Sequence, residues 1–93
     1  AGADGIFVPG VLDAADIRLF ADGVRLPLNV LAHPALTLAQ LGALGVRRVS
    51  SGSLPYRAAV DAAVASVGEL RDGSLPRPAT SYWEMQARLE GLL

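Results

Sequence analysis

The sequence contains no cysteine, little charge and few aromatic residues. Without cysteine it has neither a disulfide framework nor a thiolate metal site, which is compatible with the cytoplasmic location that we expect. The formal net charge is -1 and the basic residues are scattered, so the electrostatic footprint of a nucleic-acid-binding protein is missing. Apolar runs stop well short of the roughly 20 residues of a bilayer span, and no signal-peptide pattern opens the sequence. We expect neither a nucleic-acid nor a membrane partner.

Aliphatic side chains are abundant instead. Hydrophobic residues make up 52% of the 93 residues and charged residues 18%, and most of the apolar residues are Ala, Leu and Val. A small free-standing domain has much surface to cover with polar groups, so this balance indicates part of something larger, or a subunit with apolar contacts. The opening AGADG, at 1–5, is typical of the middle of an α/β unit, and we expect further sequence upstream of it.

Three short apolar runs predict strands. They span 6–8 (IFV), 26–31 (LPLNVL) and the start of 45–53 (GVRRVSSGS). Apolar runs bounded by glycine and proline are typical of strands buried on both faces of a parallel sheet. The third run ends in serine and glycine, which cannot extend a strand, so a ligand-sized opening is expected there.

The segments between these runs predict helices. Asp13 is a predicted N-cap for a helix over 13–22. Thr37 and Gln40 form a predicted capping box for the next helix, which Gly45 ends because glycine readily adopts a left-handed conformation.

Two further helices are predicted after the third strand. The pattern indicates a helix over 55–72, a proline-rich break over 74–80, and a terminal helix that begins at a second capping box, Ser81 with Glu84. The terminal helix carries an apolar stripe formed by Tyr82, Met85, Leu89 and Leu92. A stripe at this spacing is more typical of helix packing than of a ligand groove.

The alternation of strands and helices predicts a parallel α/β sheet with right-handed crossovers. Three strands are too few to bury both faces of such a sheet, so the simplest architecture is an arc of a β/α barrel. We therefore expect a single partial domain over 1–93. It would comprise three β/α units over 1–73, a hinge over 74–80 and a terminal packing or swapped helix over 81–93.

The strand segments resemble a known superfamily. The stretches AGADGIFVPG at 1–10, PLNVLA at 27–32 and GVRRVSSGS at 45–53 look like the last three strands of the isocitrate lyase and phosphoenolpyruvate mutase superfamily. The resemblance covers the whole chain in order and spacing. It implies strands six to eight of a (β/α)8 TIM barrel, followed by an extra C-terminal helix.

The resemblance also implies a chemistry. Such enzymes are lyases or mutases that cleave or form a C–C or P–C bond of 2-oxo acid or enolpyruvate-type substrates, through a pyruvate enolate held on Mg²⁺. The metal-binding carboxylates lie on the earlier strands. The resemblance therefore implies a Mg²⁺ bound outside this segment, no catalytic or metal-binding residue within it, and no turnover by this segment alone.

Four residues carry over as substrate-binding candidates. Asn29 matches an asparagine near the active-site end of strand seven, and Ser51 and Gly52 match the end of strand eight. Together with Gly10 they would form one wall of a pocket for a small-molecule carboxylate substrate. The methylisocitrate lyase branch has a glutamate after Phe-Pro at the end of strand six, where this sequence reads VPG at 8–10, so phosphonomutase-like members are the nearer match.

Several polar residues also have a structural interpretation. Asn29 suits a substrate contact or a structural hydrogen bond equally well, because an unpaired buried amide costs about 1–3 kcal/mol. His33 lies in a strand-to-helix loop, where barrel enzymes place their chemistry, but a lone histidine is more often a loop residue. Asp13 and Asp16 favour helix capping over a paired-carboxylate site.

Arg47 and Arg48 are expected to face opposite sides of the third strand, by its two-residue alternation. Strands six and eight of a barrel contribute to the same interior layers, which makes Asp4 a partner for Arg48. We expect a structural ion pair between Asp4 and Arg48 rather than a phosphate site, because burying an arginine without a partner is costly.

The C-terminal helices favour a homo-oligomer. Their composition is apolar and rich in alanine, and the resemblance implies that such helices pack on, or swap with, a neighbouring subunit. Two other functions stay open: a non-catalytic α/β fragment or assembly module, and a barrel enzyme of unrelated chemistry that shares only the strand pattern.

Overall fold

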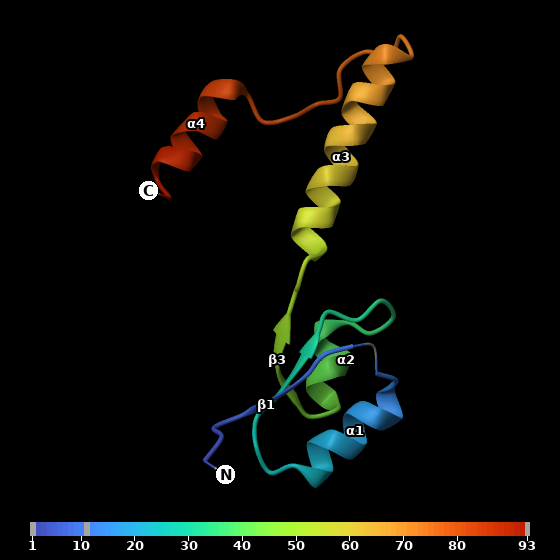
Figure 1. Ribbon diagram of the computed structural model, residues 1–93, viewed down its shortest axis with the longest axis vertical. Coiled ribbons are helices and arrows are strands. Elements are labelled where there is room, and N and C mark those ends of the chain that lie inside the picture. Colours follow the sequence, from blue (N-terminus) through green and yellow to red (C-terminus); the bar gives the residue numbers. More distant parts are fainter. Residues whose placement is uncertain (1, 11, 93) are drawn as a thin grey trace. The chain divides into compact units, whose positions relative to one another are not determined.

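The computed structural model describes residues 2–10 and 12–92, in which strands and helices alternate before a final helix (Figure 1). The elements are β1 (Ile6–Val8), α1 (Ala14–Gly23), β2 (Leu28–Leu31), α2 (Leu38–Ala43), β3 (Val46–Ser50), α3 (Leu54–Arg71) and α4 (Tyr82–Glu90). The chain divides into two units, 1–56 and 57–93, whose boundary falls within α3. The predicted hinge over 74–80 has no helix or strand.

The first unit contains a parallel three-stranded sheet in the order β1-β2-β3. Its register aligns Phe7 with Asn29 and Asn29 with Arg48. The pairing shifts by one residue at Arg47, so the simple alternation expected through the two arginines is interrupted there. The parallel order confirms the predicted fold class.

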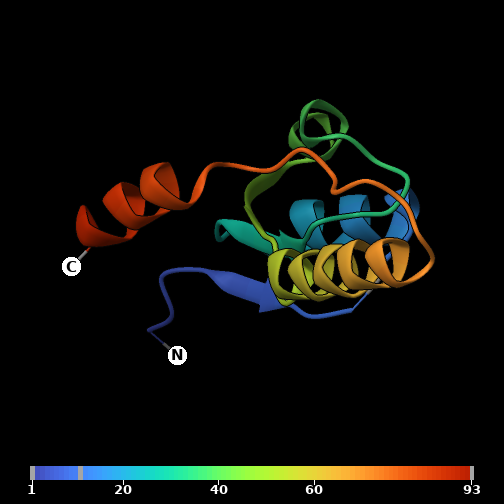
Figure 2. The ribbon, with the colours of Figure 1, turned by 90° about the horizontal axis from the view of Figure 1, so that it is seen from above.

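The helices α1 and α2 pack on one face of this sheet (Figure 2) and share one hydrophobic core with it. The buried core residues are Ile17, Leu28, Val30, Leu41 and Val46. Full burial of an aliphatic side chain contributes about 1.5–3 kcal/mol, so these five residues are the main anchor of the unit. Each β/α segment supplies at least one of them, which makes the segments mutually dependent.

The helix caps follow the sequence closely in this unit. Asp13 accepts a hydrogen bond from the N–H of Asp16 through Oδ1 at 2.8 Å, which confirms its capping role. Thr37 and Gln40 make both bonds of the predicted capping box, at 3.2 and 2.8 Å. Gly45 ends α2 with a φ of 103°.

The second unit contains the rest of α3, and α4. The helix α3 ends in a Schellman motif, in which Gly73 (φ 92°) donates to the Leu70 carbonyl and Ser74 to the Glu69 carbonyl. The side chain of Glu69 accepts two hydrogen bonds from Arg77, one of them at 2.6 Å. Arg77 thereby holds the pKa of Glu69 below its ordinary value, chiefly through hydrogen bonding and also through its charge.

The cap of α4 differs from the prediction. Ser81 accepts a hydrogen bond from the N–H of Glu84 at 3.3 Å, but the Glu84 side chain pairs with Arg88 at 2.7 Å instead of returning to the backbone. The second capping box is therefore only half formed, because the arginine one turn later competes for the carboxylate. Among the helices of the described residues, none combines the length and apolar character needed to cross a bilayer.

Candidate functional site

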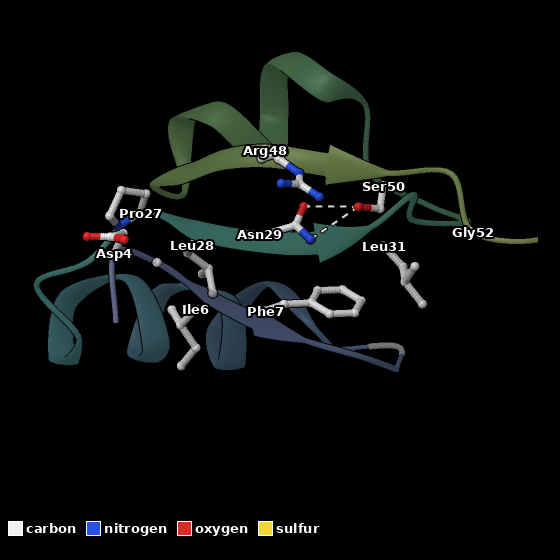
Figure 3. A pocket seen from close by; sticks show the side chains of 11 residues that line it. Asp4, Ile6, Phe7, Pro27, Leu28, Asn29, Leu31, Arg48, Ser50 and Gly52 are labelled. Carbon is white, nitrogen blue, oxygen red and sulfur yellow. Dashed lines mark hydrogen bonds between the residues drawn. The ribbon is translucent and has the colours of Figure 1, made fainter. Parts of the chain in front are cut away.

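The face of the sheet that points away from the helix-packed core carries an open hollow of about 660 Å³ (Figure 3). After the first residue of β1 and of β2, Ile6 and Leu28, which belong to both sets, residues that pack in the core alternate with residues that line the hollow, as the pleat of a strand requires. The alternating residues on the hollow side are Phe7, Asn29, Leu31, Arg48 and Ser50. Three of these five are polar, although they come from otherwise apolar strands.

Asn29 is the centre of this polar row. It is only 9% exposed, and among the residues that the structure describes it is the one polar residue that is buried. Its Nδ2 donates to Oγ of Ser50 at 3.1 Å, and that hydroxyl lies 3.3 Å from Oδ1 of Asn29 (Figure 3). The amide therefore has a structural partner across β2 and β3. An asparagine amide has two N–H donors, so one is left for a ligand in the hollow.

Arg48 lies beside Asn29 on the neighbouring strand, and both side chains project to the hollow side (Figure 3). The salt bridges of the described residues do not include the expected pair of Arg48 with Asp4. Both residues line the hollow, but Asp4 lies next to Pro27, near the start of the strands.

Strand geometry explains this difference. Phe7, Asn29 and Arg48 lie level with one another across the sheet, and Asp4 comes three residues before Phe7. The strand β2 lies between β1 and β3. The separation is therefore about 10 Å along the strands and about 10 Å across two strand spacings, which is more than the two side chains can bridge.

Of the other three predicted substrate-binding residues, one lines the hollow and two do not. Gly52 lines the hollow, where a Cβ would lie 3.3 Å from the Leu31 side chain. Gly10 and Ser51 do not line it. Ser50 does so in place of Ser51, and the two-residue alternation from Arg48 would have identified it, because only every second residue of a strand shares a face.

His33 connects two loops instead of facing the hollow. Its Nδ1 accepts a hydrogen bond from the Ala35 N–H at 3.0 Å. The proton is therefore on Nε2, which donates to the Leu12 carbonyl at 2.9 Å. Both ring nitrogens are occupied, so the structure supports the loop interpretation of His33 over a catalytic one.

The described residues do not form a metal centre. Within residues 2–10 and 12–92, no group of three or more His, Asp or Glu side chains is placed to hold an ion. The Mg²⁺ implied by the resemblance would need ligands from outside these residues.

In a TIM barrel the helices cover the outer face of the parallel sheet, and the inner face carries no helices. The uncovered face with the hollow corresponds to that inner face. A crystal structure of a protein from Burkholderia cenocepacia J2315, provisionally named a phosphonomutase, matches with a TM-score of 0.67 and 42% identity. The match covers 73% of this chain and 28% of that one. The structure thus corresponds to part of a phosphonomutase-like TIM barrel, with an extra C-terminal helix.

The sequence comparisons identify the family. The profile of phosphoenolpyruvate phosphomutase matches residues 1–71, and the chain therefore belongs to this family, within the phosphoenolpyruvate mutase and isocitrate lyase superfamily. The uncharacterized protein Rv1998c of Mycobacterium tuberculosis H37Rv is 47% identical over 90 residues, 96% of this chain and 34% of the relative. An oxaloacetate decarboxylase of Rhodopseudomonas palustris HaA2 is 35% identical over 83 residues, 86% of this chain and 28% of the relative. The chain spans about a third, or less, of the length of these curated relatives.

Proposed function

We propose that this chain supplies one wall of the active site of a lyase or mutase that cleaves or forms a C–C or P–C bond of a 2-oxo acid. The carrying observation is the polar row of Asn29, Arg48 and Ser50 on the hollow side of the sheet. We take that side as the inner wall of the barrel, which the match to a phosphonomutase-like structure supports. A structural sheet would favour apolar side chains at all three positions.

The row is suited to oxygen-rich ligands. The second amide N–H of Asn29 can donate to a carboxylate, and the Ser50 hydroxyl, within hydrogen-bond distance of both amide atoms, holds the side chain in place. Cleavage next to a 2-oxo group leaves its electron pair as an enolate, which fixed donors in a closed site stabilise. A Mg²⁺ held by residues outside those described would add Lewis acidity.

The named relatives fit this class. A decarboxylase acting on oxaloacetate breaks a C–C bond next to a 2-oxo acid, and a phosphonomutase rearranges a P–C bond. Two probes follow from this chemistry: oxaloacetate for C–C cleavage and phosphonopyruvate for P–C chemistry.

The first experiment is a binding test on the full-length gene product. Oxalate, a planar mimic of the pyruvate enolate, is titrated in the presence of Mg²⁺ while the melting temperature is followed. Binding at 100 times Kd stabilises the folded state by about 2.7 kcal/mol, so we expect a clear rise with oxalate and Mg²⁺ together and less with either alone. The second step measures turnover of the two probes. No rise and no turnover would leave the assembly module, or an unrelated barrel chemistry, as the better assignment.

We further propose that the protein is a homo-oligomer that assembles through α4. Within the described residues 12–92, four large apolar side chains in and just after this helix are exposed and share one side of it: Tyr82, Met85, Leu89 and Leu92. Exposed apolar groups gathered on one short helix are typical of an interaction surface. The same surface would serve the alternative function of an assembly module. A cytoplasmic location stays a prediction.

A further inference from the structure

We propose that Arg48 determines substrate specificity by binding the second acidic group of the substrate. This group is the carboxylate or phosphonate on the far side of the bond that is cleaved or formed, away from the 2-oxo acid unit. The inference rests on the proposed function and adds a role for Arg48 that the comparison with relatives does not assign.

The surroundings of Arg48 leave its donors available. Asn29, its neighbour in register, directs its amide toward Ser50 (Figure 3). Among the residues that the structure describes, no hydrogen bond or salt bridge occupies the Arg48 guanidinium. Of the residues lining the hollow, Asp4 is the only one with a negative charge, and it lies toward the opposite end.

Arg48 is exposed in the described residues, and its charge would need a partner on this face once the proposed barrel closes over it. An arginine on the inner wall of a barrel is costly unless an anion pairs with it. A guanidinium matches a carboxylate or a phosphonate with two parallel hydrogen bonds, whereas a neutral amide and hydroxyl offer single bonds. The two kinds of donor lie on adjacent strands, about 4.8 Å apart, so one short substrate with acidic groups at both ends can reach both.

Substituting Arg48→Gln in the full-length gene product tests the assignment. We expect kcat/KM for oxaloacetate or phosphonopyruvate to fall about 10- to 100-fold, mainly through KM, because a charge-assisted pair is lost. Oxalate fills only the 2-oxo acid unit, so its Kd with Mg²⁺ should change less than about twofold. Arg48→Lys keeps the charge without the planar fork and should recover part of the loss.

Arg47→Gln is the matched control. Arg47 precedes Arg48 on the same strand but does not line the hollow, so its variant should leave both kcat/KM and oxalate binding unchanged. A larger loss with oxaloacetate than with phosphonopyruvate would identify a carboxylate as the group that Arg48 binds, and the reverse a phosphonate.

Three results would overturn the inference. Unchanged kcat/KM in Arg48→Gln would show that the guanidinium does not contact substrate. If Arg48→Gln weakens oxalate binding as much as it lowers kcat/KM, Arg48 has a structural ion pair with a residue outside those described. The same holds if Arg48→Gln fails to fold while Arg48→Lys keeps full activity. If the unsubstituted protein neither binds oxalate nor turns over either probe, the proposed function fails first, and this outcome is distinct from the other two.

Discussion

Gly45 combines two constraints at a single residue. Its φ of 103° suits glycine, and a Cβ built there would lie 2.7 Å from Cβ of Ala21 on α1. We expect Gly45→Ala to lower the free energy of unfolding by more than about 1 kcal/mol, because left-handed backbone strain and a steric clash add together. Denaturant titration of the full-length gene product measures the change.

Gly42 is the control for this prediction. It lies inside α2, and a Cβ added there would have nothing within 4 Å, so Gly42→Ala should stabilise the protein by about 0.5–1 kcal/mol. Equal effects of the two alanines would contradict the assigned role of Gly45.

The bond between Asn29 and Ser50 predicts a coupling. Ser50→Ala leaves the buried amide without its partner and should cost about 1–3 kcal/mol of unfolding free energy. The double variant Asn29→Leu, Ser50→Ala should cost less than the sum of the two single variants, by about 0.5–3 kcal/mol in a double-mutant cycle. Ser51→Ala, at the adjacent serine outside the hollow, should stay within about 0.5 kcal/mol of the unsubstituted protein. Additive costs would mean that the two side chains do not interact.

At this scale the sequence predicts the kinds of site residue better than their positions. Two of the predicted site residues line the hollow: Asn29, a polar residue within the apolar strand β2, and Gly52, which follows the end of β3. Ser50 is absent from the predicted site because serine is a poor strand former, whereas β3 includes it. The expected pair of Arg48 with Asp4 is not formed, because β2 lies between their strands, and this lateral order is not contained in the local sequence pattern.

Among the elements, the end of α3 carries a pH-dependent contact. Because Arg77 lowers the pKa of Glu69, the contact stabilises the fold above the unfolded glutamate value of roughly 4.3, and this contribution disappears as the pH falls through the lower folded value. We expect a carboxyl NMR titration of Glu69 to show a midpoint below the ordinary glutamate value that returns toward it in Arg77→Gln. Arg71→Gln, which removes a different ion pair on the same helix, should leave the midpoint unchanged. If the titration midpoint of Glu69 is the same in Arg77→Gln as in the unsubstituted protein, the contact does not form.

Element boundaries could largely be predicted from local chemistry. The strand over 6–8 is found as predicted, and the helix capped by Asp13 is shifted by only one residue. The second strand begins at Leu28 instead of 26, after Pro27, which has no N–H to donate to a neighbouring strand. The one-residue shift at Arg47 was not predictable, because such a shift reflects how two strands meet.

For the whole molecule, the fold class follows from a simple deficit. Two short helices cover one face of the three-stranded sheet and leave the other face uncovered. In the matched phosphonomutase-like fold, this sheet is part of a larger barrel. Periodicity gives the alternation of elements and their parallel order. It gives neither the substrate nor the partner surface, because both involve groups that lie outside the local pattern.

The proposed assembly gives the last prediction. Met85 and Leu89 lie one turn apart on α4 and are 42% and 48% exposed, so they share one apolar side of the helix. We expect the full-length gene product to sediment as an oligomer at micromolar concentration, and Met85→Lys with Leu89→Lys to weaken association at least tenfold, because two charges would enter an apolar contact.

Glu90→Lys is the control for position and charge. Glu90 follows Leu89 at about 100° around the helix, away from that apolar side, and lysine there should leave the oligomer intact. The unsubstituted protein sedimenting as a folded monomer would refute the assembly outright. If Glu90→Lys dissociates the oligomer as strongly as the paired lysines, the contact is electrostatic and the apolar stripe is not its basis.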